Sequence, residues 1–187
     1  CTEAFLEAHV RAFDFFGLVP KRISYDNTRV AITQILTHHK RKHTAEFKRL
    51  ISHYLFEPHF CNVRRPNEKG VVEGSVKYAR LNFMVPVPQV TDYEELNRHL
   101  RDSCQSDMNR VLRGKRSLTK RQLLLEDRIA GIAVPDDTFD YRKTASTLAS
   151  SESLVRYDTN DYSVPVRRAH HQTTIKASAS FIEVYRQ

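Results

Sequence analysis

Two carboxylates occupy positions at which this sequence could support chemistry. Asp26 follows a short β-prone run at residues 22–25, and Glu73 comes 47 positions later in a segment with helical spacing. In an α/β core such carboxylates can converge at the end of a sheet, where their oxygens bind Mg²⁺ or Mn²⁺. Two metals held this way activate a water or a 3′-hydroxyl and stabilise the leaving oxygen in phosphodiester chemistry. Spacing alone leaves a second interpretation open, in which either residue is a solvated surface charge.

The residues around Glu73 form two stripes on a helix that we expect over residues 70–85, ended by the prolines at 86 and 88. The apolar stripe, which we expect to face the core, consists of Val72, Val76, Ala79 and Phe83. The charged stripe consists of Lys69, Glu73, Lys77 and Arg80. One acid among three bases suits a metal ligand beside DNA phosphates. The alternative is an i,i+4 ladder of ion pairs, which would stabilise the helix by a few tenths of a kcal/mol.

Helices and short strands that could position these residues alternate up to about residue 130. Apolar spacing and helix-stop residues predict helices over residues 2–16, 44–55, 70–85, 92–112 and 119–128, and strands over 22–25 and 60–63. Asp92 is the expected N-cap of the fourth helix, with Glu95 in the capping-box position.

The residue types and their spacing change after Pro135. Residues 139–187 place Thr, Ser, Val, Tyr and Ile in short alternating runs, separated by polar turns such as residues 158–161. This pattern predicts a small antiparallel sheet or barrel. Its expected apolar interior consists of Leu154, Tyr157, Tyr162, Val164, Ile175 and Ile182.

Composition narrows the class of protein. With 187 residues, 40% hydrophobic and 28% charged, the chain is globular and large enough for one domain or for a core with a small appendage. A net charge of +8 favours a polyanionic partner, without separating nucleic acid from an acidic membrane surface. Because no apolar run approaches the roughly 20 residues of a membrane span, we expect neither a spanning helix nor a signal peptide. The cysteines Cys1, Cys61 and Cys104 form no Cys-x-x-Cys pair, which fits a reducing cytosol.

Three stretches together resemble a known family. They are Ser-Tyr-Asp-Asn at 24–27, Phe-Glu-Pro-His-Phe-Cys at 56–61, and the run from Pro66 to Tyr78, of which Pro-Asn-Glu-Lys-Gly-x-x-Glu is the most specific part. They resemble the core of insertion-sequence transposases of the IstA type, which belong to the DDE group and have an RNase H-like integrase fold. Residues 160–165 also resemble the small β-barrel that follows the catalytic core in IstA and phage Mu transposases.

The resemblance implies an α/β fold that is helix-rich, with an incomplete RNase H-like core followed by a small antiparallel β-barrel. Residues 1–112 would be the C-terminal part of the integrase core, 113–138 a basic helical linker, and 139–187 the barrel domain. In the family the first catalytic Asp lies on a strand upstream of the helix that begins this chain. Asp14 cannot replace it, because Asp14 lies within an amphipathic helix. We therefore expect a fragment that is inactive by itself.

By resemblance, Asp26 and Glu73 would be catalytic acids and ligands of a two-metal site for Mg²⁺ or Mn²⁺. The parent protein would be a polynucleotidyl transferase that cleaves at transposon ends and joins them to target DNA. Its implied partners are transposon-end and target DNA, further copies of itself on that DNA, and a helper ATPase. Its implied location is the bacterial cytoplasm, in association with DNA.

Several polar and basic residues are candidates for binding DNA. They are Asn27, beside the metal site, and Lys40, Arg41, Lys42, Arg64, Arg65, Lys69, Lys77, Arg80, Arg113, Lys115 and Arg116. The basic segment 38–43 is as readily a solvated loop, and it lacks the Cys or acidic ligands of a usual zinc site. The bases of residues 110–128 suit either a linker along a DNA backbone or a soluble pair of helices. Arg167, Arg168, His170 and His171 could add a phosphate contact.

Two other classes of function remain open from the residues themselves. One is a non-catalytic DNA-binding module on the same scaffold, in which the acids bind no metal. The other is a basic structural domain that acts through protein contacts. Metal binding separates the transposase from the first alternative, and a salt-dependent affinity for DNA separates both from the second.

Overall fold

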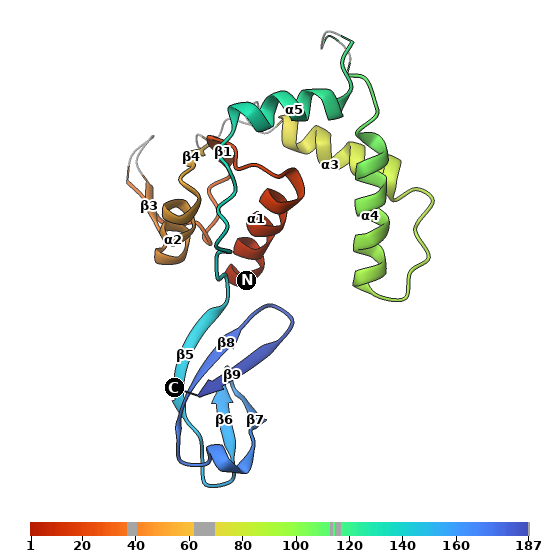
Figure 1. The fold of residues 1–187 in the computed structure, drawn as a ribbon. Helices are drawn as coiled ribbons and strands as arrows, with labels where there is room; N and C mark the ends of the chain where they lie inside the picture. Colours follow the sequence, from red (N-terminus) through yellow and green to blue (C-terminus); the bar gives the residue numbers. More distant parts are fainter. Residues whose placement is uncertain (37–40, 62–69, 113, 115–116, 187) are drawn as a thin grey trace. The chain divides into compact units, whose positions relative to one another are not determined.

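The structure, a computed structural model, describes residues 1–36, 41–61, 70–112, 114 and 117–186 (Figure 1). The chain divides into two compact units, one formed by Phe13–Val134 and the other by Cys1–Ala12 together with Pro135–Gln187. Helix α1 (Thr2–Phe16) contributes residues to both units. Within the described ranges, no helix combines the length and the apolar character that crossing a membrane requires.

A parallel pair of strands lies at the centre of the unit Phe13–Val134. Strand β1 (Arg22–Tyr25) pairs in parallel with β4 (Glu57–Phe60), and the Cys61 N–H extends the ladder to the Tyr25 carbonyl at 2.9 Å. Parallel neighbours need a crossover connection. Here the crossover contains β2 (Ile32–Ile35), β3 (Arg41–His43) and α2 (Ala45–Tyr54). The two parallel strands therefore end at the same edge of the sheet.

Helix α2 supplies the core against which β1 rests. Its N-cap is Thr44, whose hydroxyl accepts a hydrogen bond from the Phe47 N–H at 3.2 Å. The buried Phe47 ring meets the Tyr25 ring at 5.1 Å and the Phe60 ring at 6.0 Å, measured between centroids. Phe13 of α1 contacts Tyr54 of α2 at 4.7 Å. Edge-to-face aromatic packing of this kind holds Tyr25, the last residue of β1, in the core.

Two features of this unit differ from the sequence predictions. The strand that pairs with β1 spans residues 57–60, so it begins three residues before the strand predicted at 60–63, of which residues 62 and 63 lie outside the described residues. The antiparallel pair of β2 and β3 was not predicted, and it places Arg41 and Lys42 on a strand.

Three further helices complete the unit: α3 (Gly70–Phe83), α4 (Tyr93–Asp107) and α5 (Lys120–Ala130). Asp92 caps α4 as predicted, accepting from the Glu95 N–H at 2.8 Å. The Glu95 carboxylate accepts from Thr91 instead of from Asp92, so the reciprocal half of the predicted box lies one residue upstream. Helix α4 ends five residues before the predicted position, and α5 begins at a capping box of Thr119 and Gln122.

The C-terminal part of the other unit is made of antiparallel strands. Strands β5 (Lys143–Leu148), β8 (Gln172–Ala177) and β9 (Ile182–Arg186) form one sheet in that order, with β8 in the middle. Strands β6 (Leu154–Tyr157) and β7 (Asn160–Ser163) form a separate hairpin, followed by a 3₁₀ turn, Val166–Arg168. The described strands thus make two small sheets and do not close into a barrel.

A small apolar core holds these two sheets together. Ala149, Val155, Val164 and Ile175 are buried in it, and the partly buried Tyr157, Tyr162, Ile182 and Val184 pack against them. The β6–β7 turn has positive φ at both Asp158 (46°) and Thr159 (71°), which matches the right-handed twist of a two-residue hairpin. Beside this core, Asp140 accepts hydrogen bonds from Arg142 and Lys176, which lower the pKa of its carboxyl well below the usual range.

Candidate functional site

Asp26 lies immediately beyond the last residue of β1. The preceding Tyr25 is buried in the aromatic core, whereas Asp26 is exposed at the carboxyl edge of the sheet. Its Oδ1 accepts a hydrogen bond from the Asn27 N–H at 2.7 Å, and its carbonyl accepts one from the Thr28 N–H at 2.8 Å. The backbone therefore turns directly after the strand and holds the carboxylate outside the sheet.

Asn27 ties the ends of the two parallel strands together. Its Nδ2 donates to the Cys61 carbonyl at 2.9 Å, and its Oδ1 accepts from the Arg41 Nε at 2.9 Å. Both ends of the amide are thus engaged by the protein. The half-buried Arg41 is brought next to the Asp26–Asn27 turn from β3, a placement that the sequence pattern gave no means of predicting. Lys42, its neighbour on β3, is exposed.

Glu73 lies in the first turn of α3 and is exposed. Among the residues that the structure describes, none forms a hydrogen bond or an ion pair with its side chain, so the ladder with Lys77 is not formed. Lys77 and Arg80 are also exposed on this helix. The predicted core-facing stripe is wrong at its first two positions: Val72 is 62% exposed and Val76 45%. Helical periodicity identifies an apolar face, but only a neighbouring element can bury it.

Asp26 lies at the carboxyl edge of the parallel pair, and Glu73 follows the second strand in sequence. Asp26 comes directly after β1, and Glu73 lies in the first turn of the helix that comes next in sequence after β4. In open α/β sheets, ligands bind outside this edge. The two carboxylates are donors of the kind that Mg²⁺ and Mn²⁺ prefer. Within the described ranges, no group of three or more His, Cys, Asp or Glu side chains gathers in a way that could hold a metal.

Seven further candidates for DNA binding lie outside the described residues. They are Lys40, Arg64, Arg65, Lys69, Arg113, Lys115 and Arg116.

Asp107 is the centre of a charged cluster that the sequence analysis did not predict. Its Oδ1 accepts from the Tyr78 hydroxyl of α3 at 2.8 Å and from the Arg110 Nε at 2.9 Å, and its Oδ2 accepts from the Lys120 ammonium of α5. Burial raises the pKa of Asp107, but the hydrogen bonds from Lys120, Tyr78 and Arg110 outweigh it and lower that pKa to about 2. Arg110 and Lys120, read from the sequence as bases that could face DNA, therefore form internal contacts. A lone acid amid bases was the only sequence signal.

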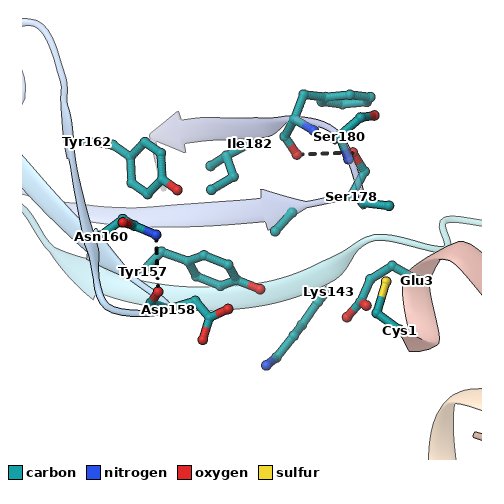
Figure 2. Close-up of a pocket in the computed structure, with 13 residues that line it drawn as sticks. Cys1, Glu3, Lys143, Tyr157, Asp158, Asn160, Tyr162, Ser178, Ser180 and Ile182 are labelled. Atoms are coloured by element: carbon teal, nitrogen blue, oxygen red, sulfur yellow. Dashed lines mark hydrogen bonds between the residues drawn. The ribbon is translucent and has the colours of Figure 1, made fainter. Parts of the chain in front are cut away.

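A separate hollow lies in the unit that contains the β-strands (Figure 2). It has a volume of about 590 Å³, and its lining includes Lys143, Tyr157, Tyr162 and Ile182. The Lys143 ammonium lies 5.9 Å from the centroid of the Tyr157 ring. None of the predicted site residues lines this hollow, so it is distinct from the carboxylate site.

The net charge is divided unequally between the two units. The unit Phe13–Val134 carries 22 Lys and Arg against 13 Asp and Glu, a net charge of +9. The other unit carries eight against nine, a net charge of −1. Arg168, one of the bases considered for phosphate binding, donates to the Val184 carbonyl at 2.8 Å. The basic character of the chain therefore belongs to the unit that contains Asp26 and Glu73.

Comparison with known proteins gives consistent matches. Residues 134–187 match the family model described as the Mu transposase C-terminal domain. A transposase of Aminobacter aminovorans is 32% identical over 174 residues, which cover 93% of this chain and 34% of that protein. The transposase for insertion sequences IS1326/IS1353 of Pseudomonas aeruginosa is 28% identical over 177 residues, covering 95% of this chain and 35% of that protein.

A third relative extends the pattern. The transposase for insertion sequence element IS21 of Pseudomonas aeruginosa is 29% identical over 174 residues, which cover 92% of this chain and 44% of that protein. The chain thus spans between 34% and 44% of the length of these three relatives. Along nearly its whole length the chain is similar to insertion-sequence transposases, and its last part is similar to the C-terminal domain of Mu transposase.

Proposed function

We propose that this chain is part of a DDE transposase with an RNase H-like core, which cleaves DNA at transposon ends and joins the freed 3′-hydroxyls to target DNA. The observation that carries the proposal is the position of Asp26 directly after β1, at the carboxyl edge of the parallel pair, with an exposed Glu73 in the first turn of α3. The similarity to transposases over 92% to 95% of the chain supports it.

Asp26 and Glu73 would hold divalent metal in this proposal, together with a donor contributed from outside the described residues. Bound Mg²⁺ would supply activation of the attacking oxygen and stabilisation of the leaving oxygen. Asn27 would keep Asp26 in position. The hydrogen bonds of its side-chain amide to the Cys61 carbonyl and to Arg41 hold the turn in which Asp26 lies. The exposed Lys77 and Arg80 would bind the phosphates of the DNA that enters the site.

The partners would follow from the same chemistry and from the family resemblance. Transposon-end and target DNA would be substrates, and two ends brought together would require further copies of the protein on the DNA. A helper ATPase is implied by the resemblance to IstA transposases.

A non-catalytic DNA-binding module is the second candidate. It is favoured by the net charge of +9 on the unit Phe13–Val134, which suits a polyanion with or without metal chemistry. The two candidates make the same prediction for DNA affinity and opposite predictions for metal dependence.

The deciding experiment measures the joining of labelled DNA ends. It uses a protein that contains this chain and has the full length of the similar transposases. We expect joined product with Mg²⁺ or Mn²⁺ and none after chelation of the metal, with DNA binding retained in both conditions. Intact DNA binding without joining under any metal condition would favour the non-catalytic module.

The phosphate contacts of α3 can be tested by salt dependence on the 187-residue chain. Replacing Lys77 or Arg80 by Ala should weaken DNA binding and lower the slope of log K against log salt by about one each, because each contact releases condensed counterions. Arg98→Ala on α4 is the control, since Arg98 is an equally exposed base on a different helix. Binding isotherms between low and moderate salt measure the slope. If the slope is the same for all three variants and for the unsubstituted chain, Lys77 and Arg80 do not contact DNA phosphates.

A further inference from the structure

Among the described residues, the first half of α3 is not held by close apolar packing. Its Val72 and Val76 are largely exposed. Between the end of α1 and α3 lies a hollow of about 590 Å³, with Phe16, Tyr78 and Phe83 in its lining. Some other contact must therefore fix the helix that bears Glu73.

Polar contacts at the start of α5 hold α3. The carboxylate of Asp107, the last residue of α4, is only 11% exposed and joins the Tyr78 hydroxyl of α3 to the ammonium of Lys120, the first residue of α5. The Arg110 guanidinium lies 4.4 Å from the centroid of the Tyr78 ring, and the Lys120 ammonium lies 5.4 Å from it. Charge-assisted hydrogen bonds and cation–π contacts on one tyrosine fix both its hydroxyl and its ring.

Contacts at the far end of α5 hold the segment that leads into β1. The Arg128 Nε donates to the carbonyl of Phe16, the last residue of α1, at 2.7 Å. Two residues beyond α5, Ile132 forms an antiparallel bridge with the buried Val19, with two hydrogen bonds of 2.9 Å. Gly131 lies between them in a tight space, since an added Cβ would lie 3.0 Å from Cδ1 of Leu18 and 3.2 Å from the Asp127 carbonyl oxygen.

Helix α5 therefore makes contacts at both ends of its eleven residues, about 16 Å apart. One end holds α3, and the other holds the chain that enters β1 and reaches Asp26. Figure 1 shows α5 running near α3, with its C-terminal end toward the β1 label. The sequence reading had assigned this basic helix to a linker, with DNA contact as one of its two roles.

We propose that α5 is a strut that fixes α3, and with it Glu73, relative to β1 and Asp26, with Asp107 and Arg128 as positioning residues. The consequence for catalysis rests on the proposed function of the two acids. The consequence for geometry does not, because it concerns only where α3 lies.

The geometric test uses the 187-residue chain without metal or DNA. Spin labels are placed at Lys48→Cys on α2 and Leu81→Cys on α3, both exposed positions, with Cys1 and Cys104 replaced by Ser and the buried Cys61 retained. Electron–electron resonance gives the distribution of distances between the labels. Asp107→Asn and Arg128→Met should each broaden it, although they act at opposite ends of α5.

Arg121→Met is the matched control, because it removes a charge from the first turn of α5 without touching Asp107, and it should leave the distribution narrow. If Asp107→Asn does not fold, Tyr78→Phe replaces it, since it removes one hydrogen bond and keeps the ring. A distribution that stays narrow in Asp107→Asn or Tyr78→Phe and in Arg128→Met would overturn the strut.

The catalytic test uses joining by a protein of full length. Asp107→Asn and Arg128→Met should each lower the rate of joining by about 10-fold to 100-fold, because a misplacement near 1 Å has effects of that order. Distant substitutions normally combine additively in free energy, so that their fold-losses multiply. Asp107→Asn and Arg128→Met release the same helix. The double variant should therefore lose about as much joining rate as the more damaged of the two single variants.

Multiplying losses in the double variant would overturn the shared strut and leave two independent structural roles. Failure of the proposed function has a different signature. In that case joining would be absent, or would be unchanged by Glu73→Gln, while the spin-label distances would still broaden in the strut variants.

Discussion

Replacing Glu73 by Gln in a protein of its relatives' full length should abolish joining of DNA ends, with a loss of about 100-fold or more. The amide keeps the shape of the side chain and removes the charge that would hold the metal. Substitution of residues that only support metal ligands typically costs 10-fold to 100-fold, so loss of a ligand should cost at least the upper part of that range. DNA affinity should stay the same or rise slightly, since a negative charge is lost near phosphates.

The matched control for this substitution is Glu94→Gln. Glu94 is also an exposed glutamate in the first turn of a helix, here α4, and its substitution should leave joining within about twofold. Mn²⁺ titration of both variants supplies a readout that is independent of turnover. If the Glu73→Gln variant still joins DNA ends, Glu73 is a surface charge and is not a metal ligand.

Truncation of Phe47 to Ala should be the most damaging single change in the unit Phe13–Val134. Phe47 is completely buried and its ring contacts Tyr25, Phe56 and Phe60, so no solvent or flexible neighbour can fill the space left behind. Phe→Ala changes in cores cost about 3–5 kcal/mol, a large part of the stability of a typical domain. Urea denaturation followed by circular dichroism measures the loss.

The same substitution should disturb the candidate site, because Tyr25 rests on Phe47 and immediately precedes Asp26. Phe15→Ala is the control: Phe15 is 38% exposed, and its truncation should cost about 1 kcal/mol or less. A loss below about 1 kcal/mol for Phe47→Ala would show that the aromatic cluster does not hold the sheet.

Local chemistry in the sequence determined much of the secondary structure. The run Arg22–Tyr25 is a strand at the predicted positions, and the helix predicted at 44–55 forms as Ala45–Tyr54. Asp92 caps α4 as predicted. These features depend on propensity, side-chain caps and apolar spacing within a few residues, which a single sequence displays directly.

Tertiary structure decided which surfaces those elements bury and which charges they pair. Val72 and Val76 have helical spacing but remain exposed, because periodicity does not reveal whether another element covers a face. The strand at 57–60 is set by its pairing with β1, a partner 35 residues away. Long-range pairing of this kind depends on the whole fold and overrides local preference.

The candidate site shows the same division. Sequence motifs identified Asp26 and Glu73 as candidate metal ligands, since their neighbours resemble those of a known family. Asp107 and Arg128 carried no such signal, because their partners, Tyr78 and the Phe16 carbonyl, are 29 and 112 positions away along the chain. Contacts between residues so distant in sequence exist only once the chain has folded, so only the tertiary structure could assign them.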